Sequence, residues 1–336
     1  MHPPIKGIAL DILYDSQHFA SQTRDGLSDS RFVQHLKKHK LLLMTSLHYG
    51  IGQATTEIKE LQEKSARTHK LASEFAKKYS DWPGIIVKGC STARMYEHNL
   101  GRVVADVDLL TTKSSAVEFY NYLRKTGCSI IPAGGNDKDR YNGDREYLVD
   151  KLMHFHEMPP LLTPDGLIVD LNFRAAYRGT QNYRQEFAID AIENFFESVL
   201  SPVSRLEKCF ENPLHELLYL CVHYACEVYL YSFEETGPNV PDIRLFKILD
   251  VAMLLRRQDN EIGEFLKVIR QASAEKPCAL MFGILVDLFD IDAAKRLLID
   301  LGIDGSELSE TYLSIEGSKK SWNATPSQRI EYDFYS

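Results

Sequence analysis

The sequence predicts an α+β protein in which a small mixed β-sheet lies between N-terminal helices and a C-terminal helical domain. Two observations predict this order. Apolar side chains recur at helical spacing in residues 29–80 and again from about residue 183 onward. Between these regions, short β-branched runs alternate with turn residues, as they do around buried strands. The 336 residues, of which 44% are hydrophobic, can bury a sizeable core and suggest two domains.

The N-terminal helical region, residues 1–80, is predicted to contain two helical segments. In residues 29–51, Asp29 or Ser30 can cap the start of an apolar stripe. In residues 55–79, apolar side chains recur near helical spacing with charged residues between them. The sequence Asp-Trp-Pro-Gly at residues 81–84 is typical of a turn, which ends the second segment.

The α/β core, residues 81–180, is predicted from the change in pattern after that turn. The expected strands cover residues 85–87, 103–110, 129–131, 152–158 and 167–173, and the expected helices cover residues 91–100 and 112–127. Pro-Asp-Gly at residues 164–166 indicates that the last two strands form an antiparallel hairpin. Residues 132–145 are rich in Gly, Asp and Asn, which predicts a mobile loop.

The C-terminal helical domain, residues 181–305, is predicted from spacing alone. Its clearest helical segments cover residues 206–231, 244–257, 262–274, 279–289 and 293–301. Residues 306–336 are polar, and we expect them to form a partly ordered tail. No internal repeat is visible along the chain.

Charge and cysteine usage restrict the class of protein. The chain carries 39 Lys and Arg against 47 Asp and Glu, a formal net charge of −8. This acidity disfavours nucleic acid and anionic membranes as the main partner, although a local basic pocket is compatible with it. No apolar run approaches the roughly 18 residues that span a bilayer, and the short run 7–13 lacks the features of a secretory signal. Six scattered cysteines without a Cys-x-x-Cys pair favour reduced thiols in the cytoplasm.

Three aspartates within apolar strands are the strongest candidates for chemistry. Asp106 and Asp108 project from the same face of one strand, because side chains alternate along a strand. Asp170 lies in a similar strand, and if the two strands are neighbours the three carboxylates converge. Three acidic oxygens with open positions suit Mg²⁺ and a substrate phosphate. The alternative is that these are surface aspartates, since Asp-x-Asp alone occurs by chance in many proteins.

A possible phosphate-binding turn precedes this strand, at residues 88–91. Gly89 would let a phosphate approach the backbone at the start of a helix, and Ser91 would add a hydroxyl donor. Lys88 is either a phosphate contact or a structural ion-pair partner. The alternative is an ordinary turn between a strand and a helix.

Further polar residues are candidates for the nucleotide-binding pocket. His154 and His156 flank a phenylalanine on a predicted strand, so both would share one face, and the alternative is a pair of hydrogen-bonded sheet histidines. Arg174 follows Asp170 closely and either reaches a phosphate or forms an exposed ion pair. Arg244, near the predicted helix 244–257, belongs to a solvated or ion-paired face, with the cleft as the alternative.

The order of these motifs resembles the DNA polymerase β-type nucleotidyltransferase superfamily: a strand ending in Gly-x-Ser, a helix, a strand with Asp-x-Asp, and a later strand with a third Asp. More narrowly, residues 87–89, 106–110 and 169–173 resemble the bacterial uncharacterised nucleotidyltransferase family, and the resemblance covers roughly residues 35–260. Two departures stand out. Cys90 replaces the usual Gly or Ser, and Asn172-Phe173 replaces the family's typical His-Trp.

The resemblance implies that residues 81–180 are a nucleotidyltransferase core that moves an NMP from an NTP such as ATP to an acceptor hydroxyl, releasing pyrophosphate. It implies that Asp106, Asp108 and Asp170 are catalytic and hold Mg²⁺ or Mn²⁺. Lys88, Gly89, Ser91, His154, His156 and Arg174 would then bind the nucleotide. The acceptor would be a small molecule or a peptide natural product. The alternatives are a nucleotide-binding regulatory protein without turnover, or a toxin-like enzyme that modifies protein or tRNA.

Overall fold

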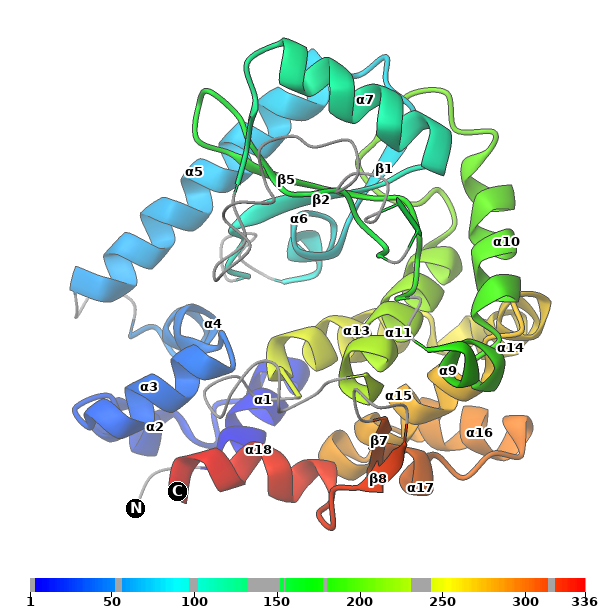
Figure 1. The fold of residues 1–336 in the computed structure, drawn as a ribbon. Coiled ribbons are helices and arrows are strands. Elements are labelled where there is room, and N and C mark those ends of the chain that lie inside the picture. The colour runs from blue at the N-terminus through cyan, green and yellow to red at the C-terminus, as the bar shows by residue number, and fades with distance from the viewer. Residues whose placement is uncertain are drawn as a thin grey trace.

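The computed structural model describes residues 4–51, 56–96, 102–131, 152–153, 155–177, 180–230, 243–313 and 318–335. Helices from both ends of the chain form a layer on one side of a small sheet, and two more helices cover the other side (Figure 1). The predicted α+β class with a mixed sheet is therefore confirmed. The loop expected at residues 132–145 lies outside the described residues.

The helices before the sheet are α1 (Ile5–Tyr14), α2 (Ala20–Gly26), α3 (Ser30–Lys38), α4 (Leu42–His48) and α5 (Thr56–Lys78). The segment predicted at residues 29–51 is two helices, because the chain turns at Lys40, whose φ is +53°. This left-handed residue lets the N–H of Leu41 donate to the carbonyl of Leu36 at 2.8 Å, which closes α3. Asp29 caps α3 by accepting a hydrogen bond from the N–H of Arg31 at 2.8 Å.

The main sheet contains β1 (Gly84–Val87), β2 (Asp106–Leu110), β3 (Ser129–Ile130), β4 (Leu161–Leu162), β5 (Ile168–Asn172) and β6 (Leu206–Glu207). Their order is β3-β4-β5-β2-β1-β6, with β2 and β5 parallel and β1 antiparallel to β2. The predicted hairpin is present, with β4 as its first strand. Of the described residues in the strand expected at 152–158, only Glu157 forms a bridge, with Asn172 of β5. Pro159 and Pro160 separate this bridge from β4, because neither has the N–H that a ladder requires.

The two faces of the sheet carry different side chains. Val107 and Leu109 of β2 pack with Val169 and Leu171 of β5 under α5 and α7 (Lys113–Lys125). Because side chains alternate along a strand, the remaining residues of β2 and β5 face the helical layer that lies below the sheet in Figure 1. The apolar face thus anchors the sheet, and the acidic face is turned toward the helices.

The helical layer joins both ends of the chain in one core. Its later helices are α9 (Gln181–Glu186), α10 (Ile189–Leu200), α11 (Pro213–Tyr229), α13 (Leu245–Arg257), α14 (Ile262–Gln271), α15 (Glu275–Phe289) and α16 (Asp292–Leu301). α11 begins at a favourable cap, in which Asn212 accepts a hydrogen bond from the N–H of Leu214 at 2.9 Å. Both α11 and α15 are buried along most of their length, which agrees with their continuous apolar sequences.

In the segment expected to form a polar tail, the described residues form regular structure. The elements are α17 (Gly305–Ser309), a small sheet of β7 (Thr311–Leu313) and β8 (Lys319–Ser321), and α18 (Pro326–Tyr335). α18 packs on α1, and the N–H of Lys6 donates to Glu331 at 3.1 Å. The polar residues of this segment lie on the outside of elements whose apolar members, such as Ile330, join the core. Among the described helices, none combines the length and apolar character that crossing a bilayer requires.

Candidate active site

Three aspartates lie together on the sheet face that is turned toward the helical layer. The parallel pairing of β2 and β5 sets Asp108 directly opposite Asp170. Asp106 lies two residues earlier on β2 and therefore on the same face. The arrangement depends on alternation, because Val107 between the two aspartates is fully buried on the opposite face.

Two of these carboxylates have no partner in the described part of the chain. No hydrogen bond or ion pair there reaches the carboxylate of Asp106 or Asp170, although both side chains are half-buried. Burial and the charge of Asp108 raise the pKa of Asp106. Burial, followed by the charges of Asp108 and Glu157, raises the pKa of Asp170 to about 8. Three carboxylates on one sheet face, near enough to affect one another's pKa, thus create a local excess of negative charge that favours a bound cation.

Lys88 partly offsets this charge. Its Nζ lies 2.8 Å from Oδ1 of Asp108, and the two side chains are only 13% and 11% exposed. Lys88 follows β1 directly, where Val87 pairs with Asp108 across the ladder, so the backbone register brings the two charges together. The φ of Lys88 is +55°, a left-handed conformation that costs a non-glycine residue on the order of 1 kcal/mol. The structure therefore shows the ion-pair alternative for Lys88.

The predicted phosphate-binding turn forms α6 (Lys88–Thr92), followed by a short 3₁₀ turn, η1 (Ala93–Met95). A Cβ at Gly89 would meet the side chain of Val104 at 3.5 Å, an ordinary contact, so packing alone does not require glycine there. The hydroxyl of Ser91 donates to the carboxylate of Glu216 and accepts a hydrogen bond from Arg94 at 2.8 Å. Ser91 thus ties α6 to α11 through a buried contact.

His156 and Arg174 lie near β5, and contacts with neighbouring residues hold both side chains in place. The ring of His156 lies 3.8 Å from that of Tyr177, and its Nε2 is 3.3 Å from Glu157. Arg174 is buried, with its Nε 3.3 Å from Glu193 and its Nη2 donating to the carbonyl of Leu152 at 3.0 Å. Arg174 therefore forms a buried ion pair rather than the exposed one considered from sequence. His154 lies outside the described residues.

Buried polar side chains of α11 and α13 continue the site into the helical layer. Lys247 forms an ion pair with Glu227, and burial lowers the pKa of Lys247 to about 8. Burial and the charge of Lys88 lower the pKa of His223 to about 4, so this ring is neutral at pH 7. The hydroxyl of Tyr219 and Nδ1 of His156 are buried without a hydrogen-bond partner in the described residues. The site thus continues from the sheet into a polar, largely buried region.

Three site residues were not predicted from sequence. Glu157 contributes a fourth carboxylate near Asp170, and Glu216 holds the turn after β1. Lys40 lies close enough to Asp106 that the aspartate's charge raises its pKa against the lowering effect of burial. None of the three belongs to a motif, and only the break in helical pattern around Lys40 could have drawn attention to it.

The donor chemistry of the site fits a hard divalent cation, because carboxylate oxygens are the ligands that Mg²⁺ prefers. The unpartnered carboxylates of Asp106 and Asp170 support this fit. Within the described ranges, however, no group of three or more His, Cys, Asp or Glu side chains is arranged around a common point as in a metal site. The ammonium of Lys88 on Asp108 is one physical reason, since it already supplies that carboxylate with a positive charge.

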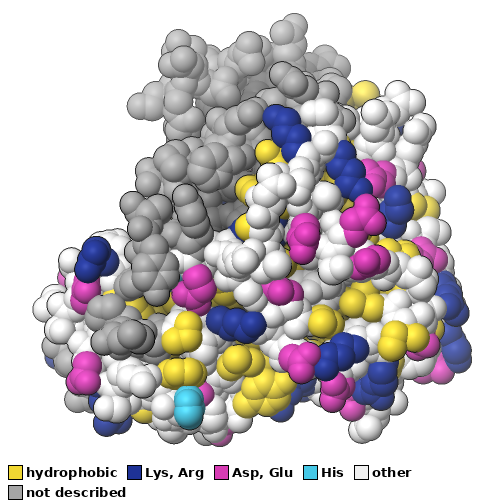
Figure 2. All heavy atoms as spheres, turned by 90° about the horizontal axis from the view of Figure 1, so that it is seen from below, with side chains coloured by type: hydrophobic (Ala, Val, Ile, Leu, Met, Phe, Trp, Pro, Cys, Tyr) yellow, Lys and Arg dark blue, Asp and Glu magenta, His cyan; other side chains and the backbone are white. Residues whose placement is uncertain are grey.

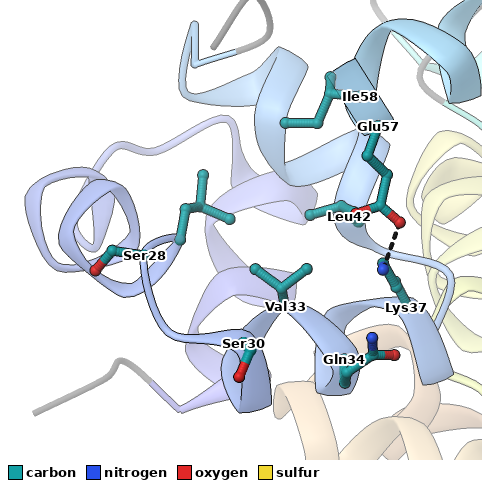
Figure 3. A pocket seen from close by; sticks show the side chains of 9 residues that line it. Ser28, Ser30, Val33, Gln34, Lys37, Leu42, Glu57 and Ile58 are labelled. Carbon is teal, nitrogen blue, oxygen red and sulfur yellow. Dashed lines mark ion pairs between the residues drawn. The ribbon is translucent and has the colours of Figure 1, made fainter. Parts of the chain in front are cut away.

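A separate hollow of about 350 Å³ lies among the N-terminal helices (Figure 3). Apolar side chains such as Val33 and Ile58 line it, and an ion pair between Lys37 and Glu57 lies at one side. It shares no residue with the carboxylate cluster. On the molecular face in Figure 2, basic and acidic side chains intermix over the described surface.

One comparison with known proteins finds a match over most of the chain. The model of a family described as uncharacterised nucleotidyltransferase matches residues 13–306. The matched range includes helices α2 to α5, the main sheet and the helices from α9 to α16. No curated protein and no solved structure matches the chain.

Proposed function

This chain belongs to the uncharacterised nucleotidyltransferase family, and from that premise we propose that it transfers an NMP from an NTP to the hydroxyl of an acceptor, releasing pyrophosphate. The observation that carries this proposal is the parallel pairing of β2 and β5, which sets Asp108 opposite Asp170 with Asp106 beside them. Family membership supports the class of reaction, and the carboxylate cluster supports the place where it occurs.

In the proposed reaction the acceptor oxygen attacks the α-phosphorus of the nucleotide. A new bond forms between that oxygen and phosphorus, and the bond from phosphorus to the β-phosphate oxygen breaks. Pyrophosphate leaves with the electron pair of the broken bond. The proton of the acceptor hydroxyl passes to the carboxylate of Asp170, which has no other partner in the described residues. Catalysis of this kind depends on positioning and on charge stabilisation.

Asp106, Asp108 and Asp170 would hold Mg²⁺ or Mn²⁺. When bound, such an ion neutralises charge on the carboxylates and on the triphosphate and orients the reacting groups. The chain's own residues provide the support. Asn172 donates to Asp108 at 3.4 Å, and Lys88, which directly follows β1, forms an ion pair with the same carboxylate. These two contacts restrict the rotation of Asp108 before any ligand arrives.

Residues around the turn after β1 and beside β5 would bind the nucleotide. We assign Lys88, together with the backbone at Gly89, to the phosphates, because both lie next to the carboxylates. Ser91 holds this turn in place through Glu216. On the other side, Arg174 fixes the carbonyls of residues 152 and 155, and thereby the segment that carries His156. His154 belongs to the same segment by sequence and stays a nucleotide-binding candidate.

The test is Mg²⁺-dependent release of pyrophosphate from each NTP in the presence of a fractionated extract that supplies acceptors. Mass spectrometry would identify the component that gains the mass of an NMP. We expect activity in the wild type and none in Asp106→Asn, which keeps the side-chain volume but removes one negative charge. Nucleotide binding without any pyrophosphate release across the fractions would favour a nucleotide-binding protein without turnover.

A further inference from the structure

The basic side chains around the carboxylate cluster are of two kinds. Those of the first kind form ion pairs with acids of the chain itself: Lys88 with Asp108, Arg102 with Asp250, and Lys247 with Glu227. Lys40 and Arg244 are of the second kind. In the described part of the chain, no carboxylate forms an ion pair with either of them. Within the described residues, two positive charges thus lie near an acidic site without an ion-pair partner, in a protein whose net charge is −8.

Lys40 reaches the site from the turn between α3 and α4. Its side chain is exposed, and its Nζ lies 5.0 Å from the centre of the Phe246 ring on α13. Although solvent reaches the side chain, partial desolvation by the surrounding protein and the charge of Arg102 lower the pKa of Lys40, whereas the charge of Asp106 raises it. These opposing influences show that Lys40 lies within electrostatic range of the carboxylates, yet it remains accessible to a ligand.

Arg244 lies at the first turn of α13, two residues before Phe246. Its carbonyl accepts a hydrogen bond from the N–H of Lys247 at 2.9 Å, which fixes the backbone, and its side chain is half-buried. The ammonium groups of Lys40 and Lys247 lie 5.0 and 5.9 Å from the centre of the same Phe246 ring, two residues after Arg244. The positive charge of Arg244 lowers the pKa of both lysines, in agreement with this close grouping. Only Lys247 has an acidic partner in the described structure, Glu227.

Two adjacent like charges repel, and an anion bound between them offsets this repulsion. A nucleoside triphosphate supplies such an anion. Its phosphates carry several negative charges, and Asp106, Asp108 and Asp170 would repel them unless positive groups lie on the opposite side. Arginine binds phosphate oxygens through two parallel N–H groups, and lysine adds a mobile point charge.

We propose that Lys40 and Arg244 together form the binding site for the terminal phosphates of the nucleotide, on the helical layer that faces the carboxylates of β2 and β5. The proposal rests on the proposed function and assigns the part of the nucleotide that the sheet and the helical layer each hold. The sheet holds the reacting α-phosphate, and the helical layer holds the phosphates that leave as pyrophosphate. Lys40 comes from the N-terminal helices and Arg244 from the C-terminal ones, so both ends of the chain contribute to one ligand.

The test measures binding by titration calorimetry in Mg²⁺ without an acceptor, for Lys40→Gln, Arg244→Gln and the wild type. The probes are the four NTPs, the corresponding monophosphates and inorganic pyrophosphate. We expect each substitution to weaken NTP and pyrophosphate binding about tenfold or more, because each removes a charge-assisted hydrogen bond to phosphate. Affinity for the monophosphate should not change. Lys267→Gln, which removes an exposed lysine of α14, is the matched control and should bind every probe normally.

NTP affinity that is unchanged in both variants would overturn the assignment, and so would an equal loss for NTP and monophosphate. Either result leaves the proposed function standing, provided that the wild type binds NTP and releases pyrophosphate. A result in which the phosphate site stands and the proposed function fails is also measurable. Pyrophosphate binding that depends on Lys40 and Arg244, in a protein without affinity for any NTP, would support the phosphate site and refute the proposed reaction. A wild type that binds none of the probes would refute both.

Discussion

Removal of the buried carboxylate of Asp250 should destabilise the protein more than loss of any exposed ion pair. Arg102 donates to both oxygens of Asp250, with donor–acceptor distances of 3.0 to 3.2 Å. The side chains of Arg102 and Asp250 are 5% and 0% exposed, so neither charge is solvated by bulk water. The hydroxyl of Tyr96 donates to the same carboxylate at 2.7 Å. Asp250 therefore satisfies two buried partners from its position on α13.

The size of the effect follows from what Asp250→Ala leaves behind. Arg102 would keep its hydrogen bond to the carbonyl of Val103, at 2.9 Å, and its contact with the Phe246 ring, but its charge would have no carboxylate partner. Leaving one member of a buried ion pair without the other costs about 3–5 kcal/mol. The orphaned hydroxyl of Tyr96 adds a cost on the order of 1 kcal/mol. We expect the free energy of unfolding to fall by about 4–6 kcal/mol, a large part of the 5–15 kcal/mol typical of a folded protein.

Urea denaturation followed by circular dichroism measures this loss as a lower midpoint at an unchanged slope. The matched control is Asp259→Ala, which removes the partner of Arg296 in an ion pair whose side chains are 53% and 54% exposed. An exposed pair of this kind contributes at most about 1 kcal/mol. If Asp250→Ala were as stable as the control variant, Arg102 and Asp250 would not form a buried pair in solution, and the reasoning would fail.

The remaining predictions concern the site, the core and pH. Asp170→Ala should keep most NTP affinity but release pyrophosphate at least about a hundredfold more slowly, since a general base contributes that much to the rate. A wild-type rate of pyrophosphate release in this variant would remove Asp170 from the mechanism. Asp108→Asn should abolish the rise in melting temperature that Mg²⁺ plus NTP gives the wild type, and a full rise would contradict its assignment. Gly283→Ala should lower the free energy of unfolding in urea by about 1–3 kcal/mol, because a Cβ would lie 2.1 Å from a backbone oxygen of the neighbouring helix. The control Gly263→Ala, where a Cβ would meet open space, should leave the free energy of unfolding unchanged or slightly raised. Burial lowers the pKa of His39 to about 3 from an unfolded value near 6.5, so stability should fall by about 1.4 kcal/mol per pH unit between these values as the solution is acidified, and His39→Gln should flatten that slope.

The local alternation of apolar and polar residues predicts the strands of this protein, because the burial of the side chains follows that alternation closely. In β2, the order Asp106-Val107-Asp108 already indicates which side chains enter the core, and Val107 is fully buried as expected. The partner of that strand is not visible locally. The pairing of Asp108 with Asp170 joins residues 62 positions apart, and the sequence supports it only through the resemblance between two apolar strands that each carry an aspartate.

The parts that sequence did not predict depend on contacts over still longer distances. Ser91 was interpreted as a phosphate donor, but its hydroxyl is bound to Glu216, 125 residues later. The ion pair of Arg174 with Glu193 is buried because a loop and a helix close over it, and no local signal distinguishes it from an exposed pair. Side-chain partners of this kind depend on how the layers pack, and that packing is not encoded in the spacing of motifs.

Contacts between the sheet and the helical layer explain why Asp106 and Asp170 can stay without a partner in the described structure. Leu110 of β2 lies on the same strand face as Asp106 and belongs to the buried core that the helices from both ends of the chain share. Arg102 and Asp250 also join the segment before β2 to α13. Because these contacts hold the sheet against the helices, the carboxylates of Asp106 and Asp170 are not needed for packing and remain available to a ligand.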